Sequence, residues 1–265
     1  MKKERVNIKQ EVKRLIEIIR NMNRKVIIIF LAVAVLQTVS WYFTSRRFFR
    51  VNFFPTYQNL PDIFLIEYLY WFIGDFFTYF LLSVVVIKFI LKEKLIDYGL
   101  TFGDYKTGLR FTLIFLIVML PFVWFVSSSP GFVAKYPHLL SARSNWGEFL
   151  IYESGMLIYM FAWEFIWRGF MLFGLKEKFG YYAVLMQMLP FVILHNGKPA
   201  LETFSAIIGG IALGILALRT SSFLYGVFVH MGIMILIDLF CTIRFRVEDY
   251  GVGFDSLFNI LSKMF

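Results

Sequence analysis

Long apolar runs dominate this chain and restrict it to one class of fold. Crossing the hydrocarbon core of a bilayer takes roughly 20 apolar residues. Seven stretches come close to or exceed this length, at residues 26–44, 65–90, 111–128, 148–174, 181–196, 201–218 and 222–243. Hydrophobic residues make up 59% of the 265, against roughly 45–50% in soluble domains. The sequence therefore predicts an all-α, polytopic transmembrane bundle of about seven spans. The stretch ending at Asn196 is short enough to be broken or re-entrant.

Basic residues follow the pattern of a multi-pass membrane protein. Residues 1–25 carry nine Lys or Arg and three Glu, with apolar residues spaced between them at Val6, Ile8, Val12, Leu15, Ile16, Ile18 and Ile19. This segment is expected to be an amphipathic helix on the cytoplasmic face. Of the 27 Lys and Arg, 17 flank the spans on the side of the N-terminus and 9 on the opposite side. The positive-inside rule then predicts a plasma-membrane protein with a cytoplasmic N-terminus.

The remaining organisation is simple. The bundle is expected at residues 26–244, as a single domain, and residues 245–265 form a C-terminal tail. The net charge of +9 fits membrane topology and anionic lipid and does not indicate nucleic acid. Cys241 is the only cysteine, which excludes an intramolecular disulfide and a Cys-rich metal site. The chain also has no Gly-rich phosphate loop, Gly-x-Ser-x-Gly elbow or His-Glu-x-x-His motif.

Three ionisable residues interrupt three different apolar stretches: Glu164, His195 and His230. An ionisable side chain at membrane depth is costly, so it indicates a functional site by default. Arg168 follows Glu164 by four residues, which places both on one helical face. The pair either locks two helices together, or Arg168 orients a carboxylate that polarises a water molecule.

The two histidines differ in context. His195 ends an apolar run and is followed by Asn-Gly-Lys-Pro, which must end the helix. It either transfers protons at a broken helix end or is an interfacial residue bonded to a carbonyl group. His230 lies eight residues into its run, with Asp238 two turns further on. Alone it would be a core residue, but the other ionisable residues favour a functional role.

Other polar residues give weaker signals. His138 is expected to be solvated in an outer loop, and Glu202 to be a solvated residue opening the next span or a second acid. Asp75 and Glu153 either extend a polar cavity or pair with Arg. Gly210 and Gly214 predict close helix packing within the monomer.

The ordered motifs resemble those of the CPBP family of intramembrane proteases, which includes the CAAX prenyl endopeptidase and bacteriocin-processing homologues. The family signature is Glu-Glu-x-x-x-Arg, then Phe-x-x-x-His, then His-x-x-x-Asn/Asp. This chain has Trp163-Glu164-Phe165-Ile166-Trp167-Arg168, then Phe191-Val192-Ile193-Leu194-His195, then His230-Met231-Gly232-Ile233-Met234. The similarity covers a protease-like core of about residues 95–242. Trp163 and Met234 depart from the signature, and the first departure is similar to that of some bacterial branches.

The resemblance implies peptide-bond hydrolysis near the membrane, on a membrane-associated protein or peptide. Glu164 with His195 would activate water, His230 would bind or protonate the oxyanion, and Arg168 would support Glu164. Zinc is an open alternative, because Glu164, His195 and His230 form a His/His/Glu ligand set with a free fourth position. The same groups serve a metal-free mechanism, which is slightly favoured since Glu164 as a ligand leaves no separate base.

Two other classes of function stay open. One is a catalytically impaired homologue that binds a membrane peptide or acts as an immunity protein, which the apolar Trp163 and Met234 favour. The other is a transporter that relays protons through His195, His230 and Asp238. A transporter predicts matching broken helices in two halves, and the sequence has one such break, at residues 196–199.

Overall fold

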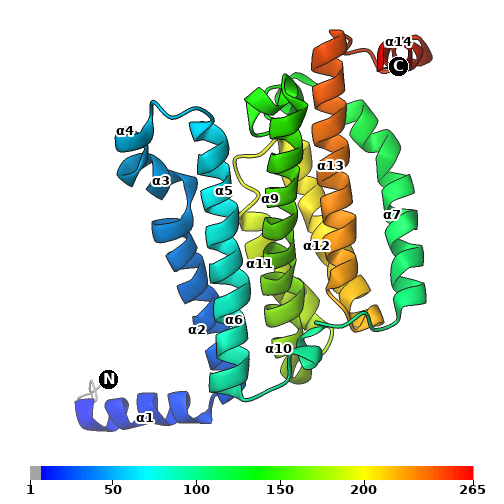
Figure 1. Ribbon diagram of the computed structural model, residues 1–265. Coiled ribbons are helices and arrows are strands. Elements are labelled where there is room, and N and C mark those ends of the chain that lie inside the picture. Colours follow the sequence, from blue (N-terminus) through cyan, green and yellow to red (C-terminus); the bar gives the residue numbers. More distant parts are fainter. Residues whose placement is uncertain (1–6, 265) are drawn as a thin grey trace, which may run out of the picture.

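The computed structural model describes residues 7–264, and over this range the chain is a bundle of helices without strands (Figure 1). Six helical segments of the described chain are long and apolar enough to cross a membrane: Arg24–Asn52, Ile63–Leu91, Tyr105–Val126, Trp146–Phe179, Ala200–Thr220 and Leu224–Val247. A seventh apolar helix, α11 (Tyr182–Ile193), has 12 residues and is shorter than a span. The predicted polytopic bundle is confirmed, and the stretch expected to be broken or re-entrant is the short one.

Several spans consist of consecutive helical pieces. The first contains α2 (Arg24–Val39), the π-helical η1 (Ser40–Thr44) and α3 (Arg46–Asn52), and the second contains α5 (Ile63–Asp75), η2 (Phe76–Leu81), α6 (Leu82–Val85) and η3 (Val86–Leu91). The others are α7 (Tyr105–Val126), the run α9 (Trp146–Glu164), η6 (Phe165–Met171) and α10 (Leu172–Phe179), then α12 (Ala200–Thr220) and α13 (Leu224–Val247). Short connecting helices are α4 (Phe54–Tyr57), η4 (Leu95–Tyr98), α8 (Pro130–Val133) and η5 (Leu140–Arg143).

Polar side chains define where three of the spans begin. Asn23 accepts a hydrogen bond from the Val26 amide at the start of α2. Asp104 caps α7, and Asn145 caps α9. Such caps satisfy amide groups that the first helical turn leaves without partners, so these short polar residues between apolar runs fix the helix starts.

The run from α9 to α10 is the centre of the bundle (Figure 1). In the 18-residue stretch of this run that best fits a membrane span, 83% of the residues are buried, against 11% in the same kind of stretch of α7. It packs against α5 on one side and α13 on another, while α11 packs against α12. Where α11 packs against α12, Gly210 and Gly214 lie close to Met188 and Val184, which confirms the predicted close packing. The helix that carries Glu164 is therefore the most enclosed one.

Two buried carboxylates of α5 accept hydrogen bonds from polar neighbours. The Oε1 of Glu67 accepts hydrogen bonds from Arg46 at 2.6 Å and from Arg50 at 2.9 Å, so these two arginines and Glu67 form an ion-pair cluster. Asp75 was expected to line a polar cavity or pair with Arg. Instead it accepts hydrogen bonds from Ser40, Thr44 and Trp71, because the π-helical turn η1 faces it.

Amphipathic helices lie across both ends of the bundle (Figure 1). Helix α1 (Ile8–Asn21) has no buried residue and exposes the apolar side chains predicted for a membrane surface. Residues 1–6 of the predicted N-terminal segment, Val6 included, lie outside the described residues. Helix α14 (Phe254–Met264) lies within the predicted C-terminal tail.

Candidate active site

The catalytic candidate Glu164 is the last residue of α9, and the π-helical segment η6 begins directly after it. Arg168 lies inside η6. A π-helical turn within an α-helix is rare and is frequent at functional sites, because its wider turn redirects side chains. The four-residue spacing of Glu164 and Arg168 predicts a regular α-helical turn between them. Instead, the backbone between these two charged residues is π-helical.

Glu164 joins two helices through one carboxylate oxygen. Its Oε1 accepts a hydrogen bond from Arg168 Nη1 at 3.0 Å and lies 2.7 Å from His230 Nδ1, which comes from α13. The side chains of Glu164 and Arg168 are 0% exposed, and that of His230 is 14% exposed. Burial strengthens these electrostatic contacts and would make an unpaired charge costly.

His195 lies beside this pair. Its ring centroid is 6.5 Å from that of His230, with the two planes inclined by 22°. The Nδ1 of His195 is 2.7 Å from the carbonyl oxygen of Phe191. Since a carbonyl oxygen only accepts, Nδ1 carries the hydrogen and Nε2 keeps its lone pair in the neutral ring. The structure thus brings Glu164, Arg168, His195 and His230 together, from three helical segments and the turn after α11.

The walls of the site are apolar at the two positions that depart from the family signature. Trp163 is 7% exposed and Met234 is 5% exposed. The Trp163 ring stacks on Tyr159 and lies 6.4 Å from the His195 ring. No side chain at these positions can supply a carboxylate or an amide, so the chemistry must come from the three ionisable groups that remain.

Several polar atoms of the site are left without a partner. Within residues 7–264, these buried atoms are Glu164 Oε2 and the Nε and Nη2 of Arg168. Buried polar groups in native proteins are nearly always hydrogen-bonded, to protein or to water. The ion pair therefore leaves one acceptor and two donor atoms that no described protein group uses. A purely structural ion pair would more commonly satisfy both sides.

Gly226 is a functional candidate that sequence reasoning missed. It lies on α13 one turn before His230, and a Cβ atom added there would come within 2.6 Å of Glu164 Oε2. Only glycine lets the carboxylate lie this close to α13. A small residue at helical spacing from His230 was the signal available in sequence.

The arrangement does not fit zinc as drawn from the sequence. Across the described part of the chain, no three His, Cys, Asp or Glu side chains are grouped to hold a metal ion. Glu164 Oε1 is already engaged by His230 and by the Arg168 guanidinium, whose positive charge opposes a dication at that oxygen. The zinc ligand set of Glu164, His195 and His230 stays a prediction.

Two residues expected to be solvated are not. His138 is half-buried, with its Nδ1 buried and its ring against Tyr136 at 4.6 Å, because the loop folds over the ends of the spans. Glu202 does open α12, but it pairs with Lys198 at 2.6 Å and accepts from Tyr136 at 2.5 Å. The prediction that these two side chains are solvated was wrong, since residues at the outer ends of the spans were assumed to face water.

Two acidic residues lie next to each other in the bundle, apart from Glu164. Glu153 of α9 and Asp238 of α13 are 8% and 0% exposed, and their side chains interact. Over residues 7–264, none of their four carboxyl oxygens meets an N–H or O–H donor. The expectation that Glu153 pairs with Arg was wrong.

Comparison with known proteins matches one segment of the chain to a protein family. Residues 145–236 match the sequence model of the family described as type II CAAX prenyl endopeptidase Rce1-like. No curated protein and no solved structure matches the chain. The matched segment contains Glu164, Arg168, His195 and His230. It supports a protease of this broad kind within a multi-pass membrane protein, and the motif-based resemblance is confirmed. Over residues 145–236 the chain is therefore similar to this family.

Proposed function

We propose that the chain is an intramembrane endopeptidase that hydrolyses a peptide bond of a membrane-associated protein or peptide. The observation that carries the proposal is the 2.7 Å contact between His230 Nδ1 and Glu164 Oε1, beside the ring of His195. It gathers costly ionisable groups from different spans at one point of membrane depth. Such a grouping is the arrangement expected of general acid and base groups.

His195 is the proposed general base. Its Nδ1–H donates to the Phe191 carbonyl group, so the Nε2 lone pair is free to take a proton. A water oxygen attacks the carbonyl carbon of the substrate while one water proton passes to His195 Nε2. The tetrahedral intermediate then collapses: the C–N bond breaks, the amine nitrogen takes that proton, and a carboxyl group and an amine leave.

Glu164 is proposed to position His230 rather than to accept the proton itself. Its Oε1 already receives Arg168 and His230, and both donors stabilise the carboxylate, which makes it a weaker base. As an imidazolium whose Nδ1–H donates to Glu164, His230 presents Nε2–H to the oxyanion. A carboxylate that orients an imidazole in this way is known from catalytic triads.

A binding homologue is the second candidate, and the site's enclosure favours it. Glu164 and Arg168 are 0% exposed, and Trp163 and Met234 replace polar groups with buried apolar ones. In that reading the ion pair holds α9 and α13 in a shape that recognises a membrane peptide. Cleavage would then require restoring polarity, as in a Trp163→Glu/Met234→Asn double variant.

The test uses purified protein reconstituted in lipid vesicles with two fluorophore-quencher peptides, one farnesylated with a CAAX-type end and one unprenylated transmembrane peptide. His195→Asn should lower cleavage by about 10² to 10⁴, while His138→Asn, a matched change outside the site, should not. Equal rates for wild type and His195→Asn would contradict the protease. Cleavage that appears only in the Trp163→Glu/Met234→Asn variant would establish the binding homologue.

Location and orientation are part of the proposal. We infer a plasma-membrane protein with a cytoplasmic N-terminus, supported by 17 against 9 flanking Lys and Arg. In intact cells, Asn59→Cys on the opposite side should react with a membrane-impermeant maleimide and Lys106→Cys should not. The native Cys241 is buried and should stay silent. Reaction of Lys106→Cys alone would reverse the orientation.

A further inference from the structure

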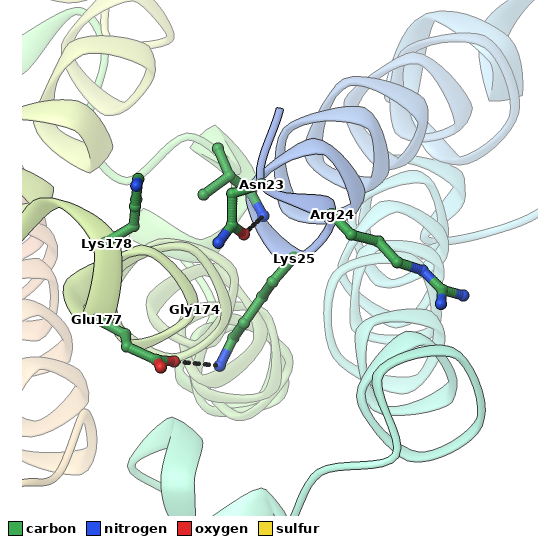
Figure 2. A pocket seen from close by; sticks show the side chains of 7 residues that line it. Asn23, Arg24, Lys25, Gly174, Glu177 and Lys178 are labelled. Atoms are coloured by element: carbon green, nitrogen blue, oxygen red, sulfur yellow. Dashed lines mark hydrogen bonds and ion pairs between the residues drawn. The ribbon is translucent and has the colours of Figure 1, made fainter. Parts of the chain in front are cut away.

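A pocket of about 330 Å³ lies at the end of the bundle where the N-terminal helix joins it (Figure 2). Its walls come from the start of α2 and from α10, two segments about 150 residues apart in sequence. The residues that line the pocket include Asn23, Arg24, Lys25, Gly174, Glu177 and Lys178. The nearest pocket residue on the same helical run, Gly174, lies 10 residues from Glu164, about 15 Å at 1.5 Å per residue. The pocket is separate from the candidate active site.

The lining of this pocket is cationic. It holds three basic residues and one acidic one. Lys25 is neutralised, because its Nζ lies 2.9 Å from a Glu93 carboxylate oxygen and 3.7 Å from one of Glu177. Arg24 and Lys178 make no salt bridge within residues 7–264. In Figure 2 Lys178 lies on the wall away from the Lys25–Glu177 contact. The free positive charge of Lys178 therefore suits an anionic group.

An apolar groove continues directly from this pocket. It has a volume of about 430 Å³ and shares Asn23, Val26 and Lys178 with the pocket. Its walls include Met22, Ile27, Phe30, Leu31 and Phe179. From Val26 to Leu31 the groove follows α2 for about 8 Å along the span. Phe30 and Leu31 are 40% and 61% exposed, so the groove opens toward the surrounding lipid.

The pocket lies at the level of the membrane surface. Helix α1 ends at Asn21, just before the pocket, and lies across the end of the bundle (Figure 1). Its apolar side chains are exposed, as expected of a helix in the interfacial plane. A charged pocket at that depth, joined to an apolar groove below it, has the two-part chemistry of a phospholipid.

We propose that the pocket and the groove bind one anionic phospholipid from the leaflet on the side of the N-terminus. The phosphate lies against Lys178, and one acyl chain lies along Ile27, Phe30 and Leu31. Basic pockets between transmembrane helices bind lipid headgroups in this way. This site is independent of the proposed hydrolysis, because its residues lie outside the Glu164 cluster.

Native mass spectrometry of the purified chain in detergent tests the site with phosphatidylglycerol, phosphatidylcholine and inorganic phosphate as probes. One phosphatidylglycerol should bind per chain at least about tenfold more tightly than phosphatidylcholine, a difference of about 1.4 kcal/mol. Lys178→Glu should remove most of this preference. Lys176→Glu is the matched control, since Lys176 is exposed two residues away, lies near the Phe173 ring and does not line the pocket.

A second pair of variants tests the groove. Ile27→Trp should fill it and weaken phosphatidylglycerol binding by about tenfold, while Val35→Trp, at an exposed position of α2 outside the groove, should not. Thermal unfolding of each variant checks that it is folded. Equal loss in Lys178→Glu and Lys176→Glu, or equal binding of the two phospholipids, would overturn the proposal. So would displacement by inorganic phosphate or by a soluble acidic peptide, which would assign the pocket to a free anion or a peptide.

Discussion

The Nδ1 of His230 lies 2.7 Å from the Oε1 of Glu164 and so connects α13 to the end of α9. The same oxygen accepts from Arg168, so one atom receives groups from two helices. This contact fixes which His230 nitrogen remains for a substrate. It also makes the position of α13 against α9 a condition for any chemistry at the site.

Gly226→Ala should impair activity far more than stability. The new methyl group would meet Glu164 Oε2 at 2.6 Å, which pushes the carboxylate and loosens its contact with His230. A misplacement of about 1 Å in a catalytic arrangement can cost about 10²-fold in rate. Peptide cleavage by the reconstituted variant measures this loss. Gly209→Ala is the control, because nothing lies within 4 Å of its added methyl group, and unchanged cleavage in both variants would contradict the assigned contact.

Arg168→Met should lower the free energy of unfolding by about 3–5 kcal/mol, since it leaves the buried Glu164 charge without its strongest partner. The double variant Arg168→Met/Glu164→Gln should recover much of this loss, because it removes both charges. Denaturant unfolding in detergent, read as a double-mutant cycle, gives the coupling between the residues. Additive effects would show that the ion pair at 3.0 Å contributes little.

Replacing a buried aspartate by asparagine should change the stability of the protein differently at Asp75 and at Asp238. Asp75 accepts three hydrogen bonds, from Ser40, Thr44 and Trp71, so Asp75→Asn should cost about 1.5–3 kcal/mol of unfolding free energy. Asp238 meets only Glu153 and, within residues 7–264, no donor. Asp238→Asn removes one of two competing carboxyl groups and should leave stability unchanged or raised. Equal destabilisation by both changes would mean that Asp238 has a partner the contacts do not show.

Acidification should destabilise the loop between α7 and α9 through His138. Burial holds the pKa of His138 well below its usual range, and Lys198, Lys135 and Arg46 lower it further. As the pH falls below about 6.5, the unfolded chain takes up a proton that the folded chain does not. Stability is therefore lost toward acid, by at most about 1.4 kcal/mol per pH unit. His138→Phe keeps a ring against Tyr136 and should flatten this part of the pH dependence of unfolding, whereas an unchanged slope would exclude His138.

Sequence alone predicted the class of fold and the four residues that meet at the site. Apolar runs set the spans, because backbone groups in lipid must pair within a helix. The spacing of Glu164 and Arg168 predicted their contact, which the structure has at 3.0 Å. The break after His195 was readable from Gly197 and Pro199, and Gly197 has a φ of +87° there.

Other features depended on tertiary contacts that no local pattern encodes. The π-helical turn after Glu164 has no sequence signature of the kind that capping residues provide. Gly226 gains its meaning only from a carboxylate 62 residues earlier in the chain. The sequence also favoured Glu164 as part of the base, while the contacts of its Oε1 favour His195. His138 was misjudged because the loop's burial arises from packing over the span ends.

The most direct test of the account is Glu164→Gln in purified, reconstituted protein, with Glu148→Gln at the exposed start of the same helical run as its control. Gln keeps the shape of the side chain but removes the charge that positions His230. Cleavage of the transmembrane peptide should fall by about 10² to 10⁴ in Glu164→Gln, with peptide binding retained and Glu148→Gln unaffected. Cleavage at the wild-type rate by Glu164→Gln would contradict the proposed active site.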